Sequence, residues 1–171
     1  MSSERIAWAV ERLNLQPHHR VLEAGCGHGV AVSLIADRLD GGSVLAIDRS
    51  PKMIQATARR NAAHVAAGVV TVQQTELADA DLGDEPFDRV LAIHLPVLQR
   101  GDAARELALL RAHMAPDGEL HVSFQPHRPA EVESIVAHVR GALEAGGFAV
   151  ARVEVADLAS GRAASVVGRP A

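Results

Sequence analysis

Three glycines spaced two residues apart, at positions 25, 27 and 29, constrain the fold of this chain more than any other feature. An apolar run ending in Glu23 and Ala24 leads into them, and a segment with apolar residues at helical spacing follows from Val30. Glycine adopts positive φ readily and, lacking a Cβ, lets a ligand touch the main chain. A loop that ends at a helix N-terminus also offers unpaired amide groups. The pattern predicts a strand, a ligand-binding loop and a helix, in that order.

The spacing of the glycines indicates which ligand to expect. A dinucleotide-binding fingerprint that starts at Gly25 requires a third glycine at position 30, where this chain has Val30. The chain instead has Glu-x-Gly-x-Gly-x-Gly, starting at Glu23. This motif closely resembles the first motif of the class I S-adenosylmethionine-dependent methyltransferases. A turn without a ligand, in a sequence rich in alanine and glycine, is the alternative.

A second acidic residue ends the next apolar run, which extends from Ser43 to Asp48. A carboxylate at the tip of the second parallel strand is placed to accept hydrogen bonds from both hydroxyls of a ribose. The competing interpretation is that Asp48 caps the following helix. Ser50 as N-cap and Pro51 at the first helical position supply that cap, so we expect Asp48 to be free for a ligand.

Apolar periodicity alternates between strand and helix along almost the whole chain. We expect a lead-in helix over residues 3–14, a loop over 75–86, an irregular segment at 95–98, a turn at 115–118 and a loop at 125–129. The expected strands are 20–24, 43–47, 69–74, 87–94 and 119–124, and the expected helices are 28–39, 51–66, 102–114 and 130–145. Such alternation predicts a parallel sheet covered on both faces. Two late strands, 148–155 and 163–167, have no helix between them and predict an antiparallel pair at the sheet edge.

Together with the resemblance, this order implies the fold of the class I methyltransferases. That fold is a Rossmann-like three-layer α/β sandwich with a mostly parallel seven-stranded sheet and an antiparallel C-terminal edge hairpin. We expect one domain over residues 1–171, in which residues 1–17 form a lead-in and residues 18–171 form the cofactor-binding core.

The resemblance also implies roles for individual residues around S-adenosylmethionine. Glu23 would orient the amino-acid end of the cofactor, and Gly25, Cys26 and Gly27 would lie against its methionine part. Asp48 would hold the ribose.

The resemblance places a further set of residues at the adenosine. Arg49 and Met53 would pack against it, although Met53 is equally typical of an ordinary helix core. Glu76 and the Leu77 backbone would meet the adenine ring, with Asp79 as the alternative acid. A solvated acidic loop is the other interpretation of this stretch.

His94, at the end of the fourth strand, is the candidate for chemistry. Histidine titrates near neutrality and can take a proton from an acceptor hydroxyl within hydrogen-bond reach. The alternative is a hydrogen-bonded residue that forms pocket wall. The Asn/Asp-Pro-Pro-aromatic signature of nucleic-acid amino methylation is missing after His94, and so is a cysteine nucleophile. Both absences favour a small-molecule acceptor.

Composition limits the partners, the cellular location and the metal binding that we expect of the protein. The net charge is −4 over 171 residues, without a run of Lys or Arg that would follow a phosphate backbone, so we expect no nucleic-acid partner. The single cysteine fits a reducing cytoplasm, and no stretch approaches about 18 consecutive apolar residues, so we expect no membrane association. No histidine pair has metal-ligand spacing with a third ligand, which predicts no metal.

The sequence therefore predicts a methyltransferase that uses S-adenosylmethionine on a small molecule by in-line displacement. One alternative is a non-catalytic S-adenosylmethionine-binding sensor or partner subunit, because the chain has no long lid and its segment 95–98 is irregular. A nucleotide-dependent oxidoreductase is disfavoured by Val30. Homodimer formation is left open.

Overall fold

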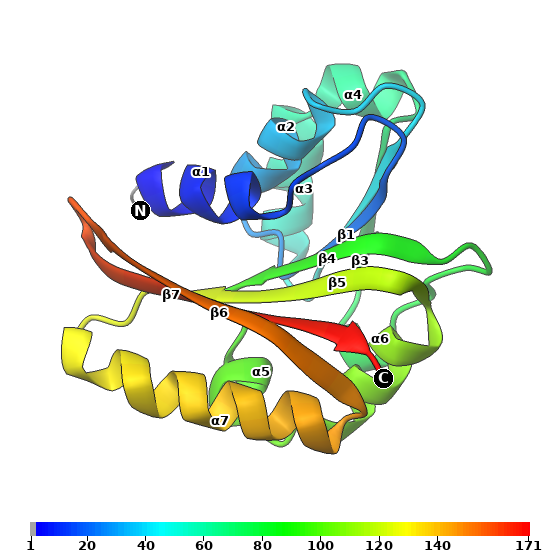
Figure 1. Ribbon diagram of the computed structural model, residues 1–171. Helices are drawn as coiled ribbons and strands as arrows, with labels where there is room; N and C mark the ends of the chain where they lie inside the picture. Colours follow the sequence, from blue (N-terminus) through cyan, green and yellow to red (C-terminus); the bar gives the residue numbers. More distant parts are fainter. Residues whose placement is uncertain (1–2) are drawn as a thin grey trace.

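The computed structural model describes residues 3–171, and residues 1–2 of the expected lead-in lie outside the described part. Its strands form one seven-stranded sheet of order β3-β2-β1-β4-β5-β7-β6 (Figure 1). Five strands run parallel: β1 (Arg20–Ala24), β2 (Ser43–Asp48), β3 (Val70–Gln74), β4 (Phe87–Ile93) and β5 (Met114–Phe124). β6 (Phe148–Leu158) and β7 (Gly161–Pro170) pair antiparallel, and β7 inserts beside β5. The predicted Rossmann-like sheet and its antiparallel edge are confirmed.

Helices cover both faces of the sheet (Figure 1). On one face lie α1 (Ser3–Arg12), α2 (Val30–Ala36), α3 (Pro51–Arg60) and α4 (Ala62–Ala66), and on the other lie α5 (Pro96–Arg100), α6 (Ala104–Ala112) and α7 (Val132–Ala145). Each face has its own apolar core, because β1 and β4 bury side chains on both sides. Within residues 3–171, no helix combines the length and the apolar character that a membrane crossing requires.

Local signals in the sequence explain where several elements begin and end. Ser50 caps α3 by accepting a hydrogen bond from the Met53 amide at 3.4 Å, and Pro51 occupies the first helical position, as predicted. α7 ends at Gly146, and the following Gly147 has a φ of 80°.

Two predicted helices are shorter than expected because of the glycine loop. The first begins only at Val30, since the loop occupies the positions before it. The second is interrupted at Asn61, whose side chain forms hydrogen bonds to the glycine loop and to α2. Its amide nitrogen donates to the Gly29 carbonyl at 3.1 Å, and its oxygen accepts from Ser33 at 2.8 Å.

Two other expectations were wrong in detail. Most of segment 95–98 is regular, because Pro96 starts the short helix α5 and Leu95 is its extended N-cap residue. Residues 115–118 extend β5 rather than forming a turn, and an irregularity in the β4–β5 register absorbs them between Phe87 and Arg89. The loop 75–86 contains one 3₁₀ turn, Leu77–Asp79, and another 3₁₀ turn, Pro129–Glu131, precedes α7.

Candidate functional site

A cavity of about 400 Å³ opens at the carboxyl ends of the parallel strands, where the strand order reverses between β1 and β4. This is the place where open α/β sheets bind ligands. Its walls come from the glycine loop, the tips of β2 and β4, the segment after β3, and helices α5 and α6. The lining residues are Gly25, Ile47, Asp48, Arg49, Thr75, Glu76, Leu77, Ile93, His94, Leu95, Pro96, Val97 and Glu106.

All three loop glycines are left-handed, with φ values of 78°, 53° and 74° at Gly25, Gly27 and Gly29. Their surroundings differ. A Cβ on Gly29 would lie 2.9 Å from the backbone of Thr57, whereas a Cβ on Gly27 would meet nothing within 4 Å. The amides of Gly25 and Cys26 both donate to the Ile47 carbonyl, at 2.9 and 3.0 Å, and tie the loop to β2. Gly29 therefore serves helix packing, and the backbone at Gly27 is left open to a ligand.

Asp48 fixes the loop as well as lining the cavity. Its carboxylate accepts from the Gly27 amide at 3.0 Å and from the Ser50 amide at 2.8 Å. Ser50 supplies the N-cap as predicted, and Asp48 additionally positions the start of α3 by accepting from the Ser50 amide. A carboxylate has about four acceptor positions, so it retains room for a ligand hydroxyl.

Glu23 lies beneath the loop and is only 3% exposed. Its Oε2 atom has no hydrogen-bond partner among the described residues. Burial, followed by the negative charge of Asp48, raises the pKa of Glu23 to about 8. A buried acid in this condition is stabilised by a ligand that brings a positive charge or a hydrogen-bond donor.

His94 borders the cavity and is held in an uncommon conformation. Its φ is 53°, and its ring Nε2 lies 3.2 Å from the Gln125 amide, which donates to it. Burial, followed by the positive charge of Arg5, lowers the pKa of His94 to about 4. The ring is therefore neutral at pH 7, with Nε2 as acceptor and the proton on Nδ1. This arrangement favours the pocket-wall role over the base role.

The structure brings most of the expected residues to the cavity, but not all. Arg49, Glu76 and Leu77 line it, together with Gly25, Asp48 and His94. The Cys26 side chain is buried in the core instead, with its Sγ 3.5 Å from the Thr57 hydroxyl, and burial raises its thiol pKa to about 12. Glu23, Gly27 and Met53 are not lining residues either, and Asp79 pairs with Arg105 at 3.0 Å.

Sequence reasoning missed several lining residues, among them Ile47 and Glu106. Ile47 directly precedes Asp48 on β2, so the end of that strand was the available signal. Glu106 directly precedes the inward-facing Leu107 on the predicted helix, but successive helical residues point about 100° apart, so helical phase gave no signal for it.

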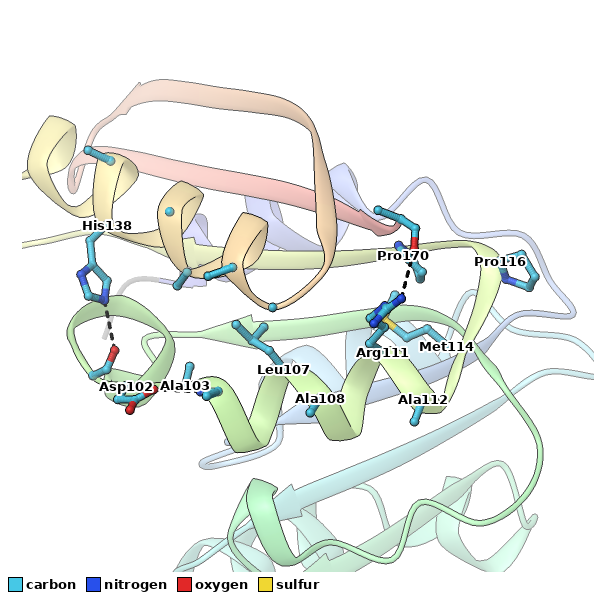
Figure 2. A pocket seen from close by; sticks show the side chains of 18 residues that line it. Asp102, Ala103, Leu107, Ala108, Arg111, Ala112, Met114, Pro116, His138 and Pro170 are labelled. Atoms are coloured by element: carbon cyan, nitrogen blue, oxygen red, sulfur yellow. Dashed lines mark hydrogen bonds between the residues drawn. The ribbon is translucent and has the colours of Figure 1, made fainter.

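A larger groove of about 1060 Å³ lies elsewhere, between α6 and α7 beside the C-terminal residues (Figure 2). Arg111 closes one end by donating to the Ala171 carbonyl at 3.3 Å, and His138 contacts the Gly101 carbonyl at 3.2 Å. Alanine and glycine dominate its walls, and the glycine loop contributes nothing to it. Size alone therefore does not identify the site. No group of metal-ligating side chains gathers among the described residues.

Comparison with known proteins agrees with this geometry. The family model described as "Methyltransferase domain" matches residues 21–118, from β1 to β5. The YrhH protein of Bacillus subtilis (strain 168) is 28% identical over 115 residues, which are 67% of this chain and 62% of that protein. This chain thus matches less than two thirds of the length of that relative.

Solved structures share the fold at low sequence identity. A S-adenosylmethionine-dependent methyltransferase from Aquifex aeolicus has a TM-score of 0.79 at 20% identity, with 97% of this chain and 89% of that chain covered. The [4+2]-cyclase SpnF has a TM-score of 0.80 at 16% identity, with 98% and 81% covered. Because the fold also carries other chemistry, the function must be argued from the site.

Proposed function

This chain belongs to the methyltransferase domain family, and from that premise we propose that it transfers a methyl group from S-adenosylmethionine to a small-molecule acceptor. The observation that carries the proposal is the buried Glu23. Its Oε2 has no hydrogen-bond partner among the described residues, and the charge of Asp48 acts on its carboxyl group. Two carboxylates beneath a glycine loop suit a ligand with an ammonium and a sulfonium group. The pyrophosphate of a dinucleotide brings no positive charge that would stabilise the ionised form of Glu23.

The residues present fit the parts of this cofactor. Glu23 would receive the ammonium group, and the open backbone at Gly27 would lie against the methionine chain. Asp48 would hold the ribose, and Arg49, Glu76 and Leu77 would border the adenine. Leu95 and helix α5 would close the other side of the cavity.

When bound, S-adenosylmethionine supplies a methyl carbon made electrophilic by the sulfonium. The protein then contributes mainly alignment, which holds the acceptor atom in line with that carbon. His94 would contribute as pocket wall, because its Nε2 is already occupied by the Gln125 amide. Such a site suits an acceptor whose reacting atom carries no proton that a base would have to remove.

The acceptor class, the partners and the location are part of the same proposal. With a net charge of −4, the chain offers no general electrostatic attraction to nucleic acid. A small acceptor in the cytoplasm, with no nucleic-acid or membrane partner, fits this charge and the single buried cysteine.

Calorimetric titration with S-adenosylmethionine and S-adenosylhomocysteine tests the proposal. We expect micromolar binding to the wild type and a loss of about tenfold or more in Asp48→Asn, because a charge-assisted hydrogen bond is removed. Asp81→Asn is the matched control, since Asp81 also accepts from a backbone amide, that of Gly83 at 3.1 Å, but does not line the cavity.

The titrations separate the alternatives. Absence of binding to either sulfur nucleoside, or tighter binding to a nicotinamide dinucleotide, would overturn the proposal. Binding without methyl transfer to any acceptor in a broad screen would favour a cofactor-binding sensor or partner subunit.

A further inference from the structure

A second, much smaller cavity lies directly beside the cofactor pocket. It holds about 10 Å³, roughly the space of one water molecule, and it shares Ile93 and His94 with that pocket. Its other walls come from α1, from the end of β5 and from the start of β7. These lining residues are Arg5 and Trp8, Ser123 and Phe124, and Ala163. An acceptor that approaches a methyl group in the cofactor pocket would come from such an adjoining space.

Arg5 is the unusual member of these walls. Its guanidinium makes no ion pair or hydrogen bond among the side chains that the structure describes, and its Nε is buried without a partner. Burial lowers the pKa of Arg5 from its ordinary value. By contrast, Arg12 on the same helix reaches Glu154 at 3.5 Å. A buried guanidinium nitrogen without an acceptor is costly, so the site calls for an anion.

The neighbouring charges do not neutralise Arg5. The only acid near it on α1, Glu4, is engaged by the amides of Ala159 and Ser160 at 3.2 Å each. The positive charges of Arg5 and Arg100 both act on His94. The space around His94 is therefore positive, in contrast to the acidic floor of the cofactor pocket.

We propose that Arg5 binds a carboxylate of the methyl acceptor, whose apolar body lies against Trp8 and Phe124. This inference rests on the methyltransferase function proposed above. The planar guanidinium fork matches a carboxylate, and the remaining walls are mostly apolar. Because the cavity is nearly closed, the acceptor enters as the half-buried Arg5 side chain turns aside to meet it. Arg5 is thus a specificity-determining residue.

The position of Arg5 favours the acceptor over the carboxylate of the cofactor itself. The glycine loop follows β1, whereas Ser123 and Ala163 lie on β5 and β7. In the sheet order β1-β4-β5-β7, these strands are two and three places from β1. The glycine loop contributes no lining residue to this cavity, so Arg5 lies on the β5 and β7 side of His94.

Calorimetry with matched probes tests this inference on the protein saturated with S-adenosylhomocysteine. The probes are phenylacetate, its neutral amide and phenyl phosphate. The variants are Arg5→Gln and, as the matched control, Arg100→Gln, whose arginine already pairs with Glu131 at 3.5 Å. We expect the acid to bind the wild type about tenfold tighter than the amide. Arg5→Gln should abolish this preference, and Arg100→Gln should keep it.

Each other result contradicts the inference in a distinguishable way. Equal or absent binding of the acid and the amide removes the carboxylate site, while unchanged S-adenosylhomocysteine affinity leaves the methyltransferase proposal intact. Weaker S-adenosylhomocysteine binding in Arg5→Gln would assign Arg5 to the cofactor. Tighter binding of phenyl phosphate than of phenylacetate would replace the carboxylate by a phosphate. Loss of S-adenosylhomocysteine binding in the wild type would overturn the proposed function instead.

Discussion

At the scale of residues, the three loop glycines share a left-handed backbone but not a reason for it. Gly29 is needed for both its conformation and its size, because Thr57 and the side chain of Asn61 fill the space beside it. Gly27 is needed for its conformation, and the space beside it is open. One motif thus combines a packing requirement with a binding requirement.

Alanine substitutions separate these two requirements. Gly27→Ala should cost about 1 to 2 kcal/mol of unfolding free energy, which is the penalty of a left-handed L-residue. Gly29→Ala should cost roughly 3 kcal/mol or more, because overpacking against Thr57 adds to that penalty. Urea denaturation measures both values. Equal losses in the two variants would show that the contact with Thr57 does not matter.

At the scale of elements, the C-terminal hairpin is attached to the rest of the sheet by charge as well as by strand pairing. Glu119 on β5, only 4% exposed, binds Arg152 of β6 with both oxygens at 2.9 Å. It also accepts from Arg169 of β7 at 2.6 Å and lies 3.1 Å from the His121 ring. These partners hold the pKa of Glu119 well below its usual range.

Removal of this charge should leave two arginines without their shared partner. Glu119→Gln is expected to lower the unfolding free energy by about 1.5 to 3 kcal/mol, because charge-assisted hydrogen bonds are lost while the arginines stay partly solvated. Glu154→Gln is the control, because Glu154 also binds Arg152, at 2.8 Å, but is more exposed. Its expected loss is about 1 kcal/mol or less. Chemical denaturation compares the two, and similar losses would contradict a central role for Glu119.

A second attachment joins α1 to the turn between β6 and β7. The Glu4 carboxylate accepts from the Ala159 and Ser160 amides, and Gln125, beside His94, donates from its side chain to the Gly161 carbonyl at 2.9 Å. Glu4→Gln should therefore increase hydrogen exchange in the turn by several-fold. Glu11→Gln on the same helix should not, because Glu11 contacts only Arg12, at 3.9 Å. Unchanged exchange in Glu4→Gln would show that strand pairing alone holds the turn.

The sequence was most informative where one element determined its own structure. The strand, glycine loop and Asp48 could be located because spacing and local chemistry fix them. The break at Asn61 was not predictable, since its cause is a hydrogen bond to Gly29, 32 residues away. The sequence around Leu95 and Pro96 was interpreted as irregular, although Pro96 is the first residue of helix α5. The surroundings of Arg5 were not predictable either, because they depend on which strands α1 packs beside.

At the scale of the whole molecule, buried titratable groups set opposing pH limits on stability. The pKa of Glu119, His94 and His121 is lowered by the fold, so their contribution is lost as pH falls. The pKa of Glu23 is raised to about 8, so its contribution is lost as pH rises from about 4.5 to about 8. Between about pH 4.5 and 6.5, the lowered pKa values of His94, His121 and His19 together outweigh the raised pKa of Glu23. The cofactor-free protein should therefore be most stable near pH 6 to 6.5.

This balance connects stability to the binding site. As pH rises above about 6.5, the histidines become neutral in the unfolded state as well, and the raised pKa of Glu23 then lowers stability by at most about 1.4 kcal/mol per pH unit. Urea denaturation of the cofactor-free wild type should show stability falling from pH 6.5 to 8, whereas Glu23→Gln should stay flat and be the more stable protein at pH 8. Saturating S-adenosylhomocysteine should flatten the wild-type profile, because its ammonium group would pair with the ionised Glu23. A parallel decline in wild type and Glu23→Gln would mean that Glu23 is ionised beneath the loop without a ligand, and a buried acid kept for the cofactor would then be the wrong explanation of this site.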